Sequence, residues 1–237
     1  ALGILDKWEP VRKKYMDRAF SLGYNCASFI LNATEYGVSQ KRERVFFIGF
    51  KDNNDPFFEY HMNDFIERQK NPAPTIRELL APLGKAGTKN NPNTCTAKIT
   101  FATRPIMRKS PYAGMYFNGQ GRPMCIDGYS NTLPASMGGN KTPFVDEEYL
   151  YGDAPEDWVV AYHKGLMDGS ITPEFTEAPS RLRRITIREA ARIQTFPDNY
   201  IFCGNKGRIY TQIGNAVPCK LAEAVAKAVV TYINEQH

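Results

Sequence analysis

The apolar positions of the first 50 residues follow two different spacings. At the start they recur every three to five residues, which predicts a helix with Pro10 in its first turn and Gly23 just past its end. The apolar positions of this helix are Trp8, Val11, Tyr15, Ala19 and Phe20. Residues 24–31 and 44–50 are short, β-rich runs, and the second is apolar on both faces. We interpret these elements as the end of an α/β sheet, because a whole doubly wound sheet needs more strands.

Residues 51–182 show little periodicity and are rich in Pro, Gly, Asn and Thr. Two short helices are expected there: one at 75–83, opened by a Thr-x-x-Glu capping box, and one at 155–169. Residues 86–96 have the composition of a loop. The pattern predicts a separate, loop-rich and mostly β small domain between two segments of the α/β domain.

The last 55 residues are helical in pattern again. A second capping box, Thr186 with Glu189, predicts a helix that ends near Gln194. After a turn-rich stretch, a long helix is expected to run from about Pro218 to the C-terminus. The turn at Gly214-Asn215 would then lie at the entry of that helix. It either presents free backbone amides to a carboxylate or phosphate, or is an ordinary N-cap at Asn215.

Composition restricts the class of protein. The 237 residues are 42% hydrophobic and 23% charged, which is ordinary for a globular chain. No apolar run approaches the length of a membrane span, and no basic segment precedes an apolar stretch as in a secretory signal. The five cysteines lie far apart, which fits neither a disulfide framework nor a metal site. We therefore expect a cytoplasmic protein without a structural metal.

The net charge of +5 conceals three blocks. Residues 98–141 contain six basic residues and one acid, residues 142–179 nine acids and one base, and residues 180–208 seven bases and two acids. The blocks are either solvated surface or two phosphate-facing surfaces separated by an acidic spacer. In the last block, arginines at every fourth position from Arg184 to Arg192 predict a basic stripe on one helix face.

The sequence Gln40-Lys41-Arg42-Glu43-Arg44 precedes the second predicted strand. Arginines two residues apart on an extended chain point the same way, and the strand would hold them rigidly. They could bind a phosphate and donate to a carbonyl oxygen of a base. The alternative is an exposed salt-bridge cluster with Glu43.

Three segments together resemble a known family. YGVSQKRERVFFIGF, RRITIREAARIQTFPDNY and QIGNAVP occur in that order, and they are similar to three blocks of the DNA (cytosine-5)-methyltransferases. Asn131-Thr132-Leu133 is similar to the Thr-Leu pair of that family's target-recognition domains. One departure is Ser39, where the family usually has Pro. The resemblance implies domains at 1–54 (the end of a Rossmann-like catalytic sheet), 55–182 (target recognition) and 183–237 (return to the catalytic domain).

The resemblance also implies roles for individual residues. Arg44 would contact a flipped cytosine, and Arg42 would order the active site with Gln40. Asn215 and Ala216 would line a pocket for S-adenosylmethionine. The block around Arg188 would organise the recognition domain against the catalytic domain. The expected DNA-binding residues, taken from the resemblance and the basic blocks, are Thr132, Arg104, Arg108, Lys109, Arg122, Asn140 and Arg188.

The family's Pro-Cys-Gln, Glu-Asn-Val and glycine-rich cofactor blocks do not occur in these 237 residues. Pro218-Cys219 lies in the predicted last helix and is not the nucleophile. We therefore expect the C-terminal half of a methyltransferase, with double-stranded DNA and an N-terminal half or subunit as partners, or a second copy covering its apolar faces. The alternative is a non-catalytic, sequence-specific DNA-binding module. A generic RNA-binding protein fits less well, because aromatic stacking platforms are not apparent.

Overall fold

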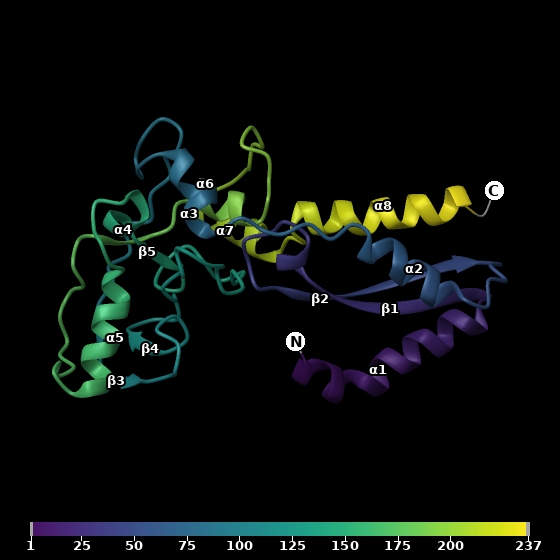
Figure 1. Cartoon of the computed structure of the whole chain (residues 1–237), viewed down its shortest axis with the longest axis horizontal. Coiled ribbons are helices and arrows are strands. Elements are labelled where there is room, and N and C mark those ends of the chain that lie inside the picture. Colours follow the sequence, from purple (N-terminus) through teal and green to yellow (C-terminus); the bar gives the residue numbers. More distant parts are fainter. Residues whose placement is uncertain (1, 236–237) are drawn as a thin grey trace. The chain divides into compact units, whose positions relative to one another are not determined.

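The computed structural model describes residues 2–235, with side chains from Glu9 onward. The chain forms two compact units (Figure 1). The terminal unit contains residues 1–37, 42–73 and 220–237, and the central unit contains residues 38–41 and 74–219. These bounds differ from those expected for the domains, since residues 55–73 belong to the terminal unit and residues 183–219 to the central unit.

The terminal unit begins with α1, Leu2–Ser21. The helix is longer than predicted and has Pro10 inside it rather than in its first turn. Gly23 follows with a φ of 83°, a left-handed conformation that suits glycine, as expected for the end of the helix. The side chain of Trp8 lies outside the described residues.

The two predicted strands are present as β1, Tyr24–Asn32, and β2, Glu43–Lys51. They pair antiparallel over their whole length, and a 3-10 turn, η1 (Ala33–Glu35), follows β1. Helix α1 covers one face of this ribbon, and α2 (Phe58–Glu67) and α8 (Cys219–Glu235) cover the other (Figure 1).

The packing of α2 and α8 is organised around Tyr232 of α8, which is almost completely buried. Its ring packs against the rings of Phe50 and Phe58. Its hydroxyl donates to Asp55 at 3.0 Å and accepts from the Asn53 amide at 2.8 Å. Buried tyrosines keep a polar partner in this way, so the last helix is fixed to the segment that follows β2.

The central unit has a helical layer. Both predicted capping boxes are present, at the starts of α3 (Ile76–Leu80, continued by η2, Ala81–Leu83) and α6 (Ile187–Ile193). A third helix, α7 (Lys206–Asn215), was not predicted and is capped by Asn205. The apolar side chains shared by these helices form one core: Ile76, Leu80, Leu83, Ile187, Ala190, Ala191, Ile193, Tyr210 and Ile213.

The rest of the central unit combines short strand pairs with two helices. Strands β3 (Phe101–Ile106) and β4 (Met115–Phe117) pair antiparallel, as do β5 (Phe144–Asp146) and β6 (Leu182–Arg184). The helices are α4 (Glu147–Tyr151) and α5 (Trp158–Asp168). The expectation of a mostly β domain at 55–182 is therefore wrong, because α2, α3, α4 and α5 all lie in this range.

An aromatic cluster joins α5 to the first strand pair. The rings of Trp158 and Tyr162 stack on Phe101 with centroids 5.6 and 4.6 Å away, and Phe117 packs on Phe144.

Within residues 2–235, no helix is long and apolar enough to cross a bilayer. No group of three His, Cys, Asp or Glu side chains in the described part of the chain could hold a metal ion.

Candidate functional site

In the central unit, residues 39–41 pair with the segment that begins at Ser130. The Ser130 amide donates to the Ser39 carbonyl at 3.0 Å, and the Lys41 amide donates to the Ser130 carbonyl at 2.9 Å. The Thr132 hydroxyl donates to the Lys41 carbonyl at 2.7 Å. Thr132 is exposed, yet its hydroxyl serves this pairing. The predicted Thr-Leu pair is thus part of the connection between two distant segments.

The side chain of Gln40, fully buried, extends this connection. Its Oε1 accepts from the Leu133 amide at 3.0 Å, and its Nε2 donates to Oε1 of Gln194 at 3.2 Å. Gln194 in turn donates from Nε2 to the Ile213 carbonyl at 2.7 Å, and its own carbonyl accepts from the Cys219 amide at 3.1 Å. One buried network therefore connects all three segments that carry the family resemblance.

Arg42 and Arg44 belong to the terminal unit. Arg42 is 3% exposed, and burial, with a smaller effect of the Arg44 charge, lowers its pKa to about 10. Arg44 is half-buried, and desolvation lowers its pKa as well. Its Nη1 donates to the carbonyl of Glu43 at 2.6 Å rather than to the carboxylate, which does not favour the salt-bridge alternative. Both guanidiniums stay cationic at neutral pH, and partial desolvation strengthens their interaction with an acceptor.

The first basic block remains largely unneutralised. Five of its basic residues make no ion pair among the described side chains: Arg104, Arg108, Lys109, Arg122 and Lys141. Arg122 is half-buried, and the other four are exposed. Lys98 is the member of the block that is paired, with Glu177. Asn140, the remaining residue expected to bind DNA in this region, is exposed.

The loop that carries Arg108 and Lys109 is anchored by its backbone and by Tyr112. The Tyr112 hydroxyl donates to Asp157 at 2.9 Å, and the backbone carbonyl of Tyr112 accepts from the side-chain amide of Asn131 at 3.0 Å. His163 Nε2 donates to the Arg108 carbonyl at 2.8 Å. The backbone of this loop is therefore fixed while its basic side chains face solvent.

Asp157 is buried, and its desolvation raises the pKa of the carboxyl to about 6. The hydrogen bonds from Val159 and Tyr112 act in the opposite direction but do not cancel the effect of burial. The nearby Asp146 raises this pKa further, whereas Arg181 lowers it.

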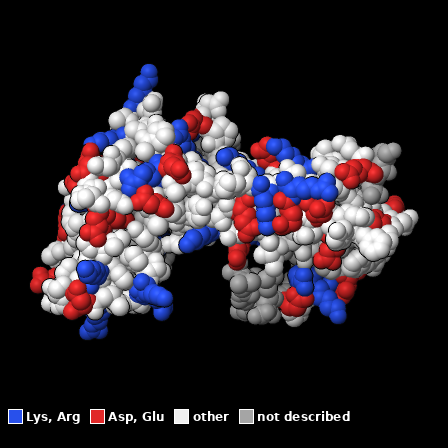
Figure 2. Space-filling model, viewed as in Figure 1, with Lys and Arg blue, Asp and Glu red and all other residues white. Residues whose placement is uncertain are grey.

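The second basic block differs from the prediction. Three of its arginines form ion pairs: Arg181 with Asp146 and Glu148, Arg183 with Glu147 and Glu189, and Arg192 with Asp198. Arg184 lies in β6, before α6 begins, so the expected stripe of arginines on one helix is wrong. Most of these acids come from the segment expected to be a spacer. On the face drawn in Figure 2, basic and acidic side chains are accordingly interspersed.

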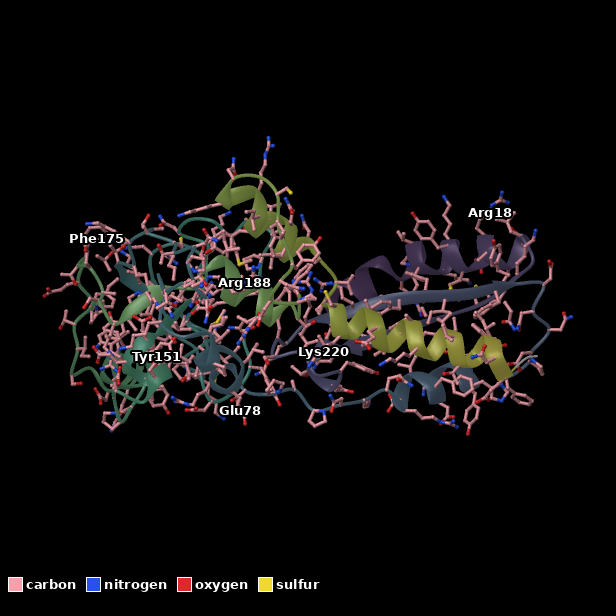
Figure 3. All side chains as sticks on the ribbon, turned by 90° about the horizontal axis from the view of Figure 1, so that it is seen from above. Arg18, Glu78, Tyr151, Phe175, Arg188 and Lys220 are labelled. Atoms are coloured by element: carbon pink, nitrogen blue, oxygen red, sulfur yellow. The ribbon has the colours of Figure 1, made fainter. Side chains whose placement is uncertain are left out.

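Arg188, labelled in Figure 3, is half-buried. Its guanidinium donates to the carbonyls of Pro197 and Tyr200, at 3.4 and 3.3 Å. These bonds hold the loop after α6. They agree better with an organising function for this segment than with a contact to DNA.

The Gly214-Asn215 turn lies at the C-terminus of α7, not at the entry of the last helix. The Ala216 amide donates to the carbonyls of Gln212 and Ile213, and α8 begins only at Cys219. The expectation of an N-cap at Asn215, or of free amides there, is therefore wrong. The exposed Asn215 carboxamide still can both donate and accept hydrogen bonds.

Three cysteines of the described chain do not have the environment of a reactive thiolate. Burial raises the pKa of the thiols of Cys26, Cys125 and Cys219. A nucleophilic cysteine needs the opposite shift. Cys219, which follows Pro218, is the first residue of α8 and is half-buried.

Comparison with known proteins gives a consistent result. A family model described as C-5 cytosine-specific DNA methylase matches residues 6–231. The Type II methyltransferase M.PspPI of a Psychrobacter strain is 57% identical over 213 residues, with 86% of this chain and 45% of that protein covered. M.MthTI of Methanothermobacter thermautotrophicus is 30% identical, with 93% and 60% covered. The chain thus spans about half the length of the curated relatives it matches.

Solved structures resemble the chain in fold. The Dnmt2 methyltransferase of S. pombe matches with a TM-score of 0.58 at 13% identity, covering 94% of this chain and 62% of the other. The methyltransferase EhMeth of Entamoeba histolytica matches with a TM-score of 0.56 at 14% identity, covering 94% and 58%. The mixed α/β fold is therefore that of a methyltransferase.

Proposed function

This chain belongs to the family of C-5 cytosine-specific DNA methylases, and from that premise we propose that it is the C-terminal part of a DNA (cytosine-5)-methyltransferase of the restriction-modification type. The complete enzyme would transfer a methyl group from S-adenosylmethionine to C5 of a cytosine flipped out of a specific duplex sequence. The observation that carries the proposal is the family match over residues 6–231, together with the Gln40–Gln194 network that joins the family's segments.

An N-terminal half would supply the nucleophile. The Pro-Cys-Gln and Glu-Asn-Val blocks are absent from these 237 residues, and the raised thiol pKa values of Cys125 and Cys219 argue against either as a substitute. The nucleophilic Cys, the acidic Glu and most of the cofactor pocket would therefore come from the other half, as a separate subunit or as part of a longer chain.

The terminal unit has a surface suited to that association. A cavity of about 610 Å³ lies between α1 and the β1–β2 ribbon, and it is almost entirely apolar. Large side chains exposed at its edge include Tyr15, Leu22 and Phe47. Such a contiguous apolar surface is typical of a protein interface. We assign it to the N-terminal half, whose strands would extend the sheet, and a second copy is the competing occupant.

Within this chain, Arg44 would donate to the carbonyl oxygen of the flipped cytosine, and Arg42 would hold the strand start and the nearby backbone. The burial of Arg42 and the half-burial of Arg44 support this assignment, because a desolvated donor interacts more strongly with a developing negative charge. Gln40 would position the segment that precedes them, since its carboxamide is committed to the buried network.

S-adenosylmethionine would supply the methyl group. The exposed carboxamide of Asn215 would form hydrogen bonds to polar groups of this cofactor. Ala216 would add a small apolar surface beside Asn215. The central unit would recognise the target sequence, with the unneutralised Arg104, Arg108 and Lys109 meeting phosphates.

A reconstitution tests the proposal. The purified chain is incubated with labelled S-adenosylmethionine and a mixed duplex substrate. The incubation is done with the chain alone and with an N-terminal polypeptide that carries Pro-Cys-Gln and Glu-Asn-Val. We expect methylated cytosine only when both polypeptides are present. Methyl transfer by the chain alone would overturn the division of labour. Sequence-specific binding without methylation, even with that polypeptide, would favour a non-catalytic DNA-binding module.

A further inference from the structure

A short glycine-flanked loop of the central unit, residues 118–122, lies directly against the segment 140–142. The Gly121 amide donates to the Asn140 carbonyl at 3.0 Å. Gly119 has a φ of 86°, and a Cβ there would be 2.6 Å from the same carbonyl. A Cβ on Gly121 would overlap the Thr142 carbonyl and lie 2.5 Å from the guanidinium of Arg184. Only glycine permits this close approach at both positions, and the backbone bond holds the loop against residues 140–142.

Arg184 holds the segment 140–142 in place through its side chain. It is 3% exposed and donates to the carbonyls of Thr142 at 2.5 Å, Ala97 at 3.1 Å and Lys98 at 3.1 Å. On the other side, the Phe144 amide donates to the carbonyl of Arg122 at 3.2 Å. The backbone of Arg122 is therefore held by β5 after the loop and by Gly121 before it.

The loop borders a cavity of about 410 Å³. The polar side chains that line it are Gln120, Arg122, Asn131, Thr132 and Lys141, and no acidic residue is among them. Its apolar lining consists of two methionines and three prolines: Met115, Pro123, Met124, Pro134 and Pro143. Because Thr132 also lines this cavity, the Thr132–Lys41 bond places its rim next to the segment that carries the Gln40 network.

The guanidinium of Arg122 lies at this rim with N–H groups available for a ligand. Its Nη1 donates to the Gln120 carbonyl at 3.2 Å, which uses one of the five N–H groups of a guanidinium and orients the plane. Among the described side chains it forms no ion pair with a carboxylate. It is half-buried, unlike exposed Lys141 on the same rim. A positioned, partly desolvated planar fork suits a base edge, whereas an exposed, flexible ammonium suits a phosphate.

We propose that Arg122 reads a guanine of the target duplex in the major groove, its guanidinium donating to O6 and N7, while Lys141 contacts a neighbouring phosphate. Guanine is the base whose major-groove edge presents two adjacent acceptors, which match this fork. The rigid glycine loop supplies the accuracy that a base contact needs. This inference rests on the proposed recognition function of the central unit and assigns one residue and one base to it.

The test selects preferred sequences from a randomised duplex pool with the 237-residue chain and three variants. Arg122→Lys keeps the charge but loses the fork, Arg122→Gln presents the pattern that pairs with adenine, and Lys141→Ala is the matched control. We expect Arg122→Lys to lose discrimination at one guanine by about tenfold or more, and Arg122→Gln to move the preference there toward adenine. Lys141→Ala should weaken binding equally on all sequences and reduce its salt dependence.

A modified base gives an independent measurement. Replacing that guanine by 7-deazaguanine, which lacks the N7 acceptor, should weaken binding by the unsubstituted chain about fivefold or more and weaken binding by Arg122→Lys by a clearly smaller factor. An unaltered preference in both Arg122 variants, or equal sensitivity of all proteins to 7-deazaguanine, would overturn the assignment of Arg122 to a guanine. The recognition function of the central unit would not be affected by that result. An unsubstituted chain that selects no sequence from the pool would instead overturn the recognition function on which it rests.

Discussion

The side-chain carboxamides of Gln40 and Gln194, 154 residues apart in the chain, are hydrogen-bonded to one another at 3.2 Å in the buried interior of the central unit. Each also bonds to backbone: Gln40 to the Leu133 amide and Gln194 to the Ile213 carbonyl. Because donor and acceptor ends are both in use, each carboxamide has one orientation that satisfies its partners. A pair of glutamines therefore connects segments that are remote in sequence.

Replacement of either glutamine by alanine should destabilise the protein. Gln40→Ala removes the acceptor at Oε1 that the Leu133 amide uses, and Gln194→Ala removes the acceptor of Gln40 Nε2 and one of the two donors to the Ile213 carbonyl. The loss of such bonds in the buried interior costs about 1–3 kcal/mol, so each variant should lose about that much of its free energy of unfolding in urea. The double variant should lose clearly less than the sum, since the two share one bond. Additive losses, or losses no larger than for exposed Gln120→Ala, would contradict the network.

Two glycines of the same region give a matched comparison. Gly121→Ala forces a Cβ against the Thr142 carbonyl and the Arg184 guanidinium, whereas a Cβ on Gly139 has nothing within 4 Å. We expect Gly121→Ala to lower the free energy of unfolding by about 2 kcal/mol or more, and Gly139→Ala to change it by less than about 1 kcal/mol. Urea titrations of both variants measure this difference. Equal stabilities would show that the loop can move away from its support.

Sequence patterns predicted the elements whose signals are local. Both Thr-x-x-Glu capping boxes start helices, because the reciprocal bonds form within four residues. Helix α2 was missed although Phe58, Met62 and Phe65 have helical spacing, because the frequent Pro and Asn around it indicated a loop. Helix α7 was missed because its N-cap, Asn205, lies in the turn-rich stretch Cys203-Gly204-Asn205-Lys206-Gly207. That omission also placed the Gly214-Asn215 turn at the wrong end of a helix.

Charge patterns along the chain could not reveal which charges are neutralised. Arg181 pairs with Asp146, 35 residues away, so a block that is basic in sequence is neutralised in part by acids from a distant segment. In the first basic block only Lys98 has such a partner among the described side chains, and the other five basic residues make no ion pair. The resemblance likewise placed Gln40 with the catalytic arginines. Its complete burial and its bond to Gln194 depend on the fold and on no local pattern.

Asp157 should make stability depend on pH. Its folded-state pKa of about 6 lies above the ordinary value of 3.8, so the folded protein holds this proton more tightly than the unfolded chain. Stability from this group is therefore greatest below pH 4 and is lost as the pH rises through 6. Asp157→Asn can keep the cap on Val159 and the bond to Tyr112 without a charge. It should be more stable than the unsubstituted chain at pH 8, by up to about 3 kcal/mol.

Urea unfolding at several pH values between 4 and 8 measures this effect. The difference between Asp157→Asn and the unsubstituted chain should grow across pH 4–6 and then level off. Asp146 and Arg181, which also influence the pKa of Asp157, are present in both proteins. Parallel curves over the whole range would contradict a buried carboxyl that is protonated near pH 6.

Arg44 and the loop arginine Arg108 should separate catalysis from binding in the reconstituted enzyme. Arg44 is half-buried at the start of β2, so Arg44→Ala should lower kcat by about 100-fold while duplex affinity changes little, as for loss of a transition-state donor. Arg108 is exposed on an anchored loop, so Arg108→Ala should weaken binding and reduce its salt dependence with kcat kept; Lys109→Ala should behave likewise. Single-turnover methylation and salt-dependent binding assays distinguish the two effects. Equal losses of affinity in all three variants would refute separate functions for the strand and the loop.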